Sequence, residues 1–116
     1  MRLCFAALIL TALSVTAVAG EIRRGAAMQV RADSIWFKDA AKLTQWQQMK
    51  KSSDAAGLTS YQEKLLSARE VWQFTKPQSV KILGFQPRDN RVNVEMRTHG
   101  RLLGSKWFVD ADAVAR

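Results

Sequence analysis

A short run with strict period-two alternation, residues 91–98, constrains the fold more than any other part of the chain. Its apolar or small members are Val92, Val94, Met96 and Thr98, and the residues between them are polar or charged. A period of two places one set of side chains on a core and the other in water. Turn signals flank the run: the PRDN segment at 87–90 precedes it and His99-Gly100 follows it. The sequence therefore predicts an antiparallel three-stranded meander over about residues 79–109.

Two strand registers across these turns would bury the same face. With Phe85 opposite Arg91, the facing pairs become Ile82 with Val94, Val80 with Met96, and Lys81 with Glu95. With Thr98 opposite Arg101, the facing pairs become Leu103 with Met96 and Trp107 with Val92. Because both registers agree on one inner face, we expect the meander to be correct and Trp107 to be a core residue.

The first 19 residues have the organisation of a secretory signal peptide. Met1-Arg2 precedes an uncharged apolar run over 3–18, and Ala17-Val18-Ala19 fits the small-x-small cleavage rule. We expect cleavage after Ala19 and a periplasmic location; the alternative is an uncleaved membrane anchor, for which the run is a little short. Cleavage would remove Cys4, the single cysteine, and with it disulfide and thiol chemistry.

The remaining chain predicts one domain over 28–116, after a flexible leader at 20–27. Residues 28–32 alternate weakly and predict a first strand, and Ile35-Trp36-Phe37 predicts an apolar plug of the core. Helical spacing of apolar residues over about 38–73 predicts an αα-hairpin, with a break at 52–54. The predicted fold class is α+β, with the N-terminal strand and the helical hairpin packed on the C-terminal meander.

Several positions in this arrangement have predicted roles. The first helix is expected over 38–51. Asp54 is the favoured N-cap of the second helix, and a later start at the capping box Ser60–Glu63 is the alternative. Asp110 is expected to cap a last helical turn that returns Val114 to the core. The tryptophans at 36, 46 and 72 are expected in the core, since each helix stripe must be covered.

The C-terminal third resembles the SH3-like small barrels, especially the bacterial type found on exported proteins. The resemblance rests on Val92-x-Val94, Gly100, Gly104, Trp107-Phe108-Val109 and Val114, in that order. The chain departs from the pattern where Ser105-Lys106 separates Gly104 from Trp107, and where the helical hairpin replaces the loop after the first strand. The resemblance implies a small barrel that binds peptides, cell-wall fragments or a protein partner, with no catalysis of its own.

Positive charge is concentrated on the predicted sheet. The formal net charge of the chain is +8, or +7 without Arg2, and residues 76–106 hold seven basic and two acidic residues. An exported basic domain can meet anionic lipid, lipid A phosphates or cell-wall polysaccharide, whereas nucleic acid is not an expected partner. The alternative is that the charge only aids solubility.

The outer face of the meander is the predicted partner-binding site. Arg91, Arg97 and Lys106 project there, with Phe108 opposite Arg91 as an exposed aromatic edge and Lys81 tied to Glu95. Two structural alternatives compete with binding: the helices cover this face, or the bases only keep a sheet edge soluble.

Residues for catalysis, metal binding or cofactor binding do not form a pattern in this sequence. His99 is the only histidine and lies in a predicted turn, and the acidic residues are scattered. We therefore expect a non-enzymatic, cofactor-free periplasmic binding or accessory domain that contacts a protein or cell-wall partner. The alternatives are a binder of anionic polymer or membrane surface, and an inhibitor of an enzyme or toxin.

Overall fold

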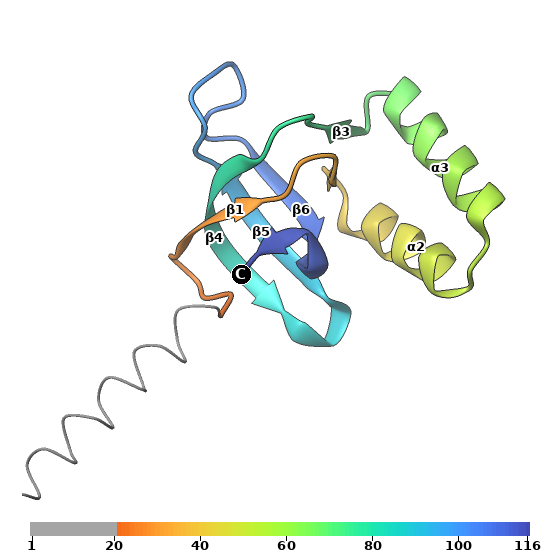
Figure 1. Cartoon of the computed structure of the whole chain (residues 1–116), viewed down its shortest axis with the longest axis horizontal. Helices are drawn as coiled ribbons and strands as arrows, with labels where there is room; N and C mark the ends of the chain where they lie inside the picture. The colour runs from red at the N-terminus through yellow and green to blue at the C-terminus, as the bar shows by residue number, and fades with distance from the viewer. Residues whose placement is uncertain (1–20) are drawn as a thin grey trace, which may run out of the picture.

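The computed structural model describes residues 21–116, so the predicted signal peptide and its cleavage point lie outside the described residues. The elements in chain order are β1 (Ala27–Val30), β2 (Ile35–Phe37), α2 (Ala40–Lys51), α3 (Ala55–Ser67), β3 (Val71–Gln73), β4 (Gln78–Gln86), η1 (Pro87–Asp89), β5 (Arg91–Met96), β6 (Lys106–Asp110), η2 (Ala111–Ala113) and β7 (Val114–Ala115). The strands form an antiparallel sheet in the order β3-β2-β6-β5-β4-β1-β7. The two helices stand to one side of it (Figure 1). The expected α+β class is confirmed, and the sheet is open, with β3 and β7 at its ends.

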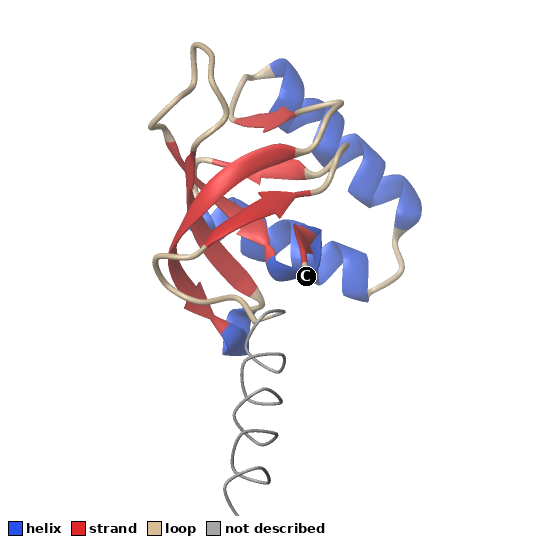
Figure 2. Ribbon diagram, turned by 60° about the vertical axis from the view of Figure 1, so that its left-hand side comes forward, coloured by secondary structure: helices blue, strands red, loops and turns tan. Residues whose placement is uncertain are grey.

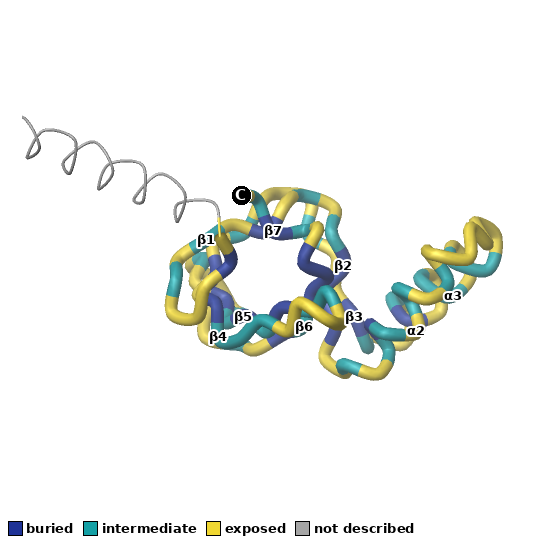
Figure 3. Tube along the Cα trace, turned by 90° about the horizontal axis from the view of Figure 1, so that it is seen from below, coloured by how far each residue is buried: buried dark blue, intermediate teal, exposed yellow. Residues whose placement is uncertain are grey.

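Two apolar clusters hold the molecule together. The main cluster lies inside the curved sheet and is formed by buried residues of every long strand, including Val30, Ile82, Val94 and Trp107. Figure 3 shows buried stretches along the strands, which curve around a common centre. The second cluster joins the helical hairpin to β2 and β3 through Phe37, Leu43, Leu65 and Val71, with Ile35 as its fifth member. The hairpin is thus attached through its own small core. Figure 2 shows from a second side how the two helices lie beside the strands.

The register between β4 and β5 is confirmed over most of its length. Val80 lies opposite Met96, Lys81 opposite Glu95, and Ile82 opposite Val94. The expected pairing of Phe85 with Arg91 is wrong, because a bulge between Ile82 and Gly84 shifts the ladder by one residue. The turn at 87–90 forms as expected: η1 is followed by Asn90 in the left-handed region, with φ of 48°.

The expected tight hairpin at His99-Gly100 is wrong. Residues 97–105 form a longer loop in which Gly100 and Gly104 both have positive φ, of 146° and 85°. Two hydrogen bonds close its base: the Met96 amide donates to the Ser105 carbonyl, and the Gly104 amide donates to the Met96 carbonyl. Trp107 consequently lies opposite Val94 rather than Val92, and Leu103 is 47% exposed rather than facing Met96. Because Trp107 shifts by two residues, its side chain keeps the predicted inner face and is buried.

The helical hairpin is present but shorter than predicted. Asp39 caps α2 by accepting the Ala41 amide, and Asp54 caps α3 by accepting the Gly57 amide at 2.9 Å, which confirms the favoured start. The second helix ends at Ser67 and not near residue 73. Residues 71–73 instead pair with β2 as strand β3.

The N-terminal part of the domain differs from expectation in two places. The first strand spans 27–30 instead of 28–32, and the apolar plug at 35–37 is itself a fully buried strand, β2. The expected flexible leader contributes to the core: Ile22 is buried in the main cluster, and the Gly25 amide donates to the Ile82 carbonyl at 2.7 Å. The last turn forms as predicted, with Asp110 capping η2 and Val114 buried.

Alkaline pH should loosen the hairpin. Lys42 donates to Glu70 at 2.7 Å, which raises the pKa of Lys42 above its ordinary value, and partial burial raises the pKa of Tyr61. A raised pKa in the folded state means that the unfolded chain releases its proton first. The stabilisation is therefore complete below about pH 10 and is lost as pH rises through the folded pKa. We expect the melting temperature to fall above about pH 10, and less steeply in Tyr61→Phe; an equally steep fall would contradict the role of Tyr61.

Candidate binding surfaces

The predicted outer-face site is only partly assembled. Arg97 donates to Glu95 at 3.2 Å, and Lys106 lies opposite Glu95 in the ladder and is exposed. Arg91 donates to Gln86 and lies 3.7 Å from the Asp89 carboxylate. Two of the three bases, Arg91 and Arg97, therefore form ion pairs on the protein itself, which reduces the charge that this face can offer to a partner.

Phe108 is not an exposed aromatic edge. It lies opposite Asn93 on β5 and opposite Phe37 on β2, instead of opposite Arg91. Its ring is half-buried against the second apolar cluster, beneath the hairpin, while the Arg91 guanidinium lies 6.0 Å from the ring centroid. The helical hairpin thus covers the Phe108 part of the face, which was one of the structural alternatives.

A groove at the other end of the domain combines apolar and cationic groups. We call it the Trp72 groove. It has a volume of about 610 Å³ and is lined by Arg69, Trp72, Phe74, Gln78, Met96, Thr98, His99, Gly100, Arg101 and Leu102. This volume lies within the range of pockets that hold small molecules or a few side chains of a peptide. The lining comes from β3 and its flanks on one side and from β5 and the 97–105 loop on the other.

Trp72 is exposed because of its place at the end of the sheet. Within β3, Val71 points into the second cluster, and Trp72 points to the opposite face, opposite Trp36 on β2. Trp36 is fully buried, but Trp72 is 39% exposed, since β3 is an end strand of the sheet that residues 21–116 form. Among the described residues, Trp72 and Leu103 are the large apolar side chains left most open to water. The expectation that Trp72 belongs to the core is wrong.

The floor of the groove (Phe74, Met96 and Leu102) is an extension of the main core. Met96 is 2% exposed, and Phe74 and Leu102 pack against the main cluster. Phe74 also meets Trp36 edge to face, with ring centroids 5.1 Å apart. The apolar floor is therefore held by packing beneath it, which leaves it preformed for a ligand.

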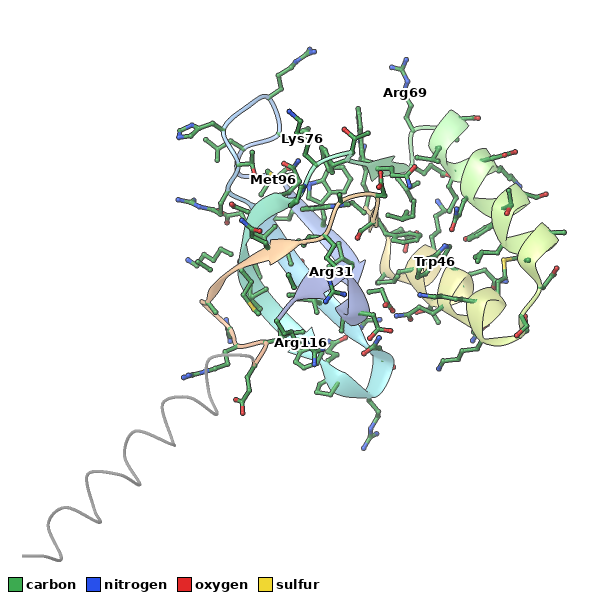
Figure 4. The ribbon with its side chains drawn as sticks, viewed as in Figure 1. Arg31, Trp46, Arg69, Lys76, Met96 and Arg116 are labelled. Atoms are coloured by element: carbon green, nitrogen blue, oxygen red, sulfur yellow. The ribbon has the colours of Figure 1, made fainter. Side chains whose placement is uncertain are left out.

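The rim of the groove (Arg69, His99 and Arg101) is basic, and the lining includes no acidic residue. The ion pairs within residues 21–116 join Lys42 to Glu70, Arg91 to Asp89, and Arg97 to Glu95, so neither rim arginine takes part in them. Figure 4 shows the Arg69 side chain projecting away from the body of the protein. Sequence reasoning predicted neither the rim nor the floor as a site.

Arg69 has an unusual backbone conformation for its residue type. It follows the last turn of α3 with φ of 59°, and the Glu70 amide closes the helix end on the Leu65 carbonyl at 3.0 Å. Glycine is the usual residue at such a helix end, because a side chain there costs about 1–2 kcal/mol. In this chain an arginine occupies the position, and it is one of the residues that line the groove.

A cluster of polar side chains surrounds Asp110, which is 7% exposed. Its Oδ1 accepts from Gln47 at 2.7 Å and from Asn90 at 3.2 Å, and its Oδ2 accepts the Asp112 amide at 3.1 Å. These bonds tie β6 to α2 and to the turn before β5. Both carboxylate oxygens accept hydrogen bonds from the protein itself, so these contacts give Asp110 a structural role.

The described part of the chain contains no cluster of three histidine, cysteine or acidic side chains that could hold a metal ion. Within residues 21–116, none of the helices has the length and apolar character needed to cross a membrane. Comparison with family models, curated proteins and solved structures finds no match for the chain.

Proposed function

We propose that the chain is an exported, non-catalytic binding module that holds a protein partner of the periplasm in the Trp72 groove. The observation that carries this proposal is Trp72 itself, an exposed tryptophan beside a preformed apolar floor and a basic rim. Tryptophan and arginine are the residues most enriched at the energetic centres of protein interfaces. A cell-wall fragment is the alternative occupant of the same groove.

For the fold of this module we infer an SH3-like small barrel with a helical hairpin inserted between β2 and β3. The order of the elements supports it: Val92 and Val94 lie in β5, two glycines lie in the next loop, Trp107–Val109 lie in β6, and η2 leads to Val114. The strands curve around the main core (Figure 3). No ladder joins the end strands β3 and β7, so the barrel in this proposal is an open one.

The test is capture of partners from envelope extract by the full-length, exported chain with a C-terminal affinity tag. We expect at least one partner to be retained between about 0.1 M and 1 M salt, over which the Debye length falls from about 10 Å to about 3 Å. Trp72→Ser should reduce the captured amount at least tenfold, because the groove loses its exposed aromatic. Arg91→Ser, Arg97→Ser and Lys106→Ser together form the matched control on the outer face and should leave capture unchanged.

The opposite pattern would support a different function. If the triple variant loses binding, Trp72→Ser keeps it, and binding vanishes with salt, the protein is a binder of anionic polymer or membrane surface. The net charge of +8 is the observation in favour of that alternative. The internal pairing of Arg91 and Arg97 is the observation against it.

A further inference from the structure

The chemistry of the Trp72 groove specifies the kind of segment that it would hold. Resting on the binding function above, we propose that the groove takes an extended acidic peptide segment that places one apolar side chain against Trp72 and carboxylates against Arg69 and Arg101. Three features of the groove lead to this assignment: its apolar floor, its basic rim without acidic residues, and its position along the end strand of the sheet.

The apolar part of the ligand follows from the floor. Trp72, Phe74 and Leu102 present aromatic and aliphatic surface at one place, with Met96 buried beneath them, and Phe74 is held against Trp36. An aliphatic or aromatic side chain inserted there would cover the exposed part of Trp72. A fully polar ligand would leave this surface in contact with water or bury it without a favourable contact.

The acidic part follows from the rim. Arg69 and Arg101 line the groove from two separate segments, one after α3 and the other in the 97–105 loop. Neither takes part in the ion pairs of residues 21–116, and the lining has no carboxylate. Because a guanidinium can bind a carboxylate through two parallel hydrogen bonds, two arginines set apart in this way favour a ligand with more than one acidic group.

The extended shape follows from the wall. The groove runs beside β3, which ends the sheet and leaves one edge of its backbone without a neighbouring strand. A peptide in an extended conformation presents alternate side chains to two sides. Such a segment can direct apolar side chains to the floor and carboxylates to the rim.

The conformation of Arg69 supplies an experimental handle. Its φ of 59° suits glycine, so Arg69→Gly removes the charge and relieves the backbone at once. If Arg69 had only a structural role, Arg69→Gly would not weaken ligand binding while it raises the stability of the fold. Arg88, an exposed arginine in η1 outside the groove lining, provides the matched control through Arg88→Ser.

The experiment measures binding of dye-labelled synthetic peptides to the full-length, exported chain by fluorescence anisotropy. One peptide carries aspartate and glutamate around a central leucine, and its partner has every acidic side chain replaced by the amide. We expect the acidic peptide to bind at least tenfold more tightly. Arg69→Gly with Arg101→Ser should weaken it at least tenfold, Arg88→Ser should leave it unchanged, and Arg69→Gly alone should melt at or above the wild-type temperature.

The outcomes separate this inference from the binding function. If both peptides bind equally and Trp72→Ser abolishes both, the groove binds polypeptide and the acidic preference is wrong. If neither peptide binds, or Trp72→Ser leaves the acidic peptide bound, the inference is overturned, while capture from envelope extract still decides the binding function. If vesicles of phosphatidylglycerol bind instead, and the outer-face triple variant loses them, the ligand is a membrane surface and the acidic peptide is wrong.

Discussion

Trp107→Ala is expected to lower the free energy of unfolding by about 3–5 kcal/mol, the largest effect of any substitution considered for this domain. Trp107 is 2% exposed, lies opposite Val94, and meets Trp36 edge to face with centroids 6.2 Å apart. Its indole nitrogen donates to Ser105 Oγ at 2.7 Å. Alanine would leave a cavity between the main core and the base of the 97–105 loop. A loss of this size is a large fraction of the stability of a small domain.

Urea unfolding followed by circular dichroism measures this loss. Trp72→Ala is the matched control, because it removes the same side chain from a site that is 39% exposed, and it should cost about 1 kcal/mol or less. Equal midpoints for Trp107→Ala and wild type would show that Trp107 does not support the core. Equal losses for the two variants would show that Trp72 is as buried in solution as Trp107.

Asp110→Ala is expected to cost about 2–3 kcal/mol, the second largest effect. The carboxylate accepts from Gln47, Asn90 and the Asp112 amide, and alanine would leave these donors without their acceptor in a largely buried place. The loss should also weaken the attachment of α2, because Gln47 is its link to the end of β6. Asp112→Ala is the control: this carboxylate is exposed, and its removal should change stability by less than about 0.5 kcal/mol.

Hydrogen exchange gives a second measurement of the same network. In Asp110→Ala, amides of α2 should exchange faster relative to those of β4 and β5, since the hairpin loses a tie to the sheet. A uniform change in all elements would mean that Asp110 supports only global stability. Wild-type exchange and wild-type unfolding together would contradict the structural role of this residue.

Features that depend on a few neighbouring residues were predictable from the sequence. The alternation over 91–96 became β5, the turn at 87–90 formed with Asn90 left-handed, and the caps by Asp54 and Asp110 are present. Each of these relies on side-chain direction or on hydrogen bonds within about three residues, so the local order of residue types is sufficient.

Local sequence information was not sufficient to predict which side chains on the outer face of the meander are exposed. Parity along a strand placed the side chains of Arg91 and Phe108 on the outer side, and the structure agrees with that direction. Parity does not say what covers a face. Phe108 is half-buried because α2 and its apolar cluster lie over it, and Arg97, which directly follows β5, forms an ion pair with Glu95. The covering of Phe108 comes from residues far away in the sequence, which the alternation cannot contain, whereas Glu95 and Arg97 are two residues apart and the alternation places them on one face.

The sequence by itself determined an α+β domain with a meander at its centre and a helical hairpin before it, whereas the tertiary structure alone decided the groove. Trp72 continues the helical spacing of Leu58, Tyr61 and Leu65, yet residues 71–74 are also rich in the β-branched and aromatic types that favour strands. The left-handed Arg69 ends the helix, and β2 supplies the backbone partner that lets residues 71–73 become a strand. Whether an aromatic residue on that strand is covered depends on the next strand in the sheet. Since the sheet ends at β3, Trp72 remains open to water.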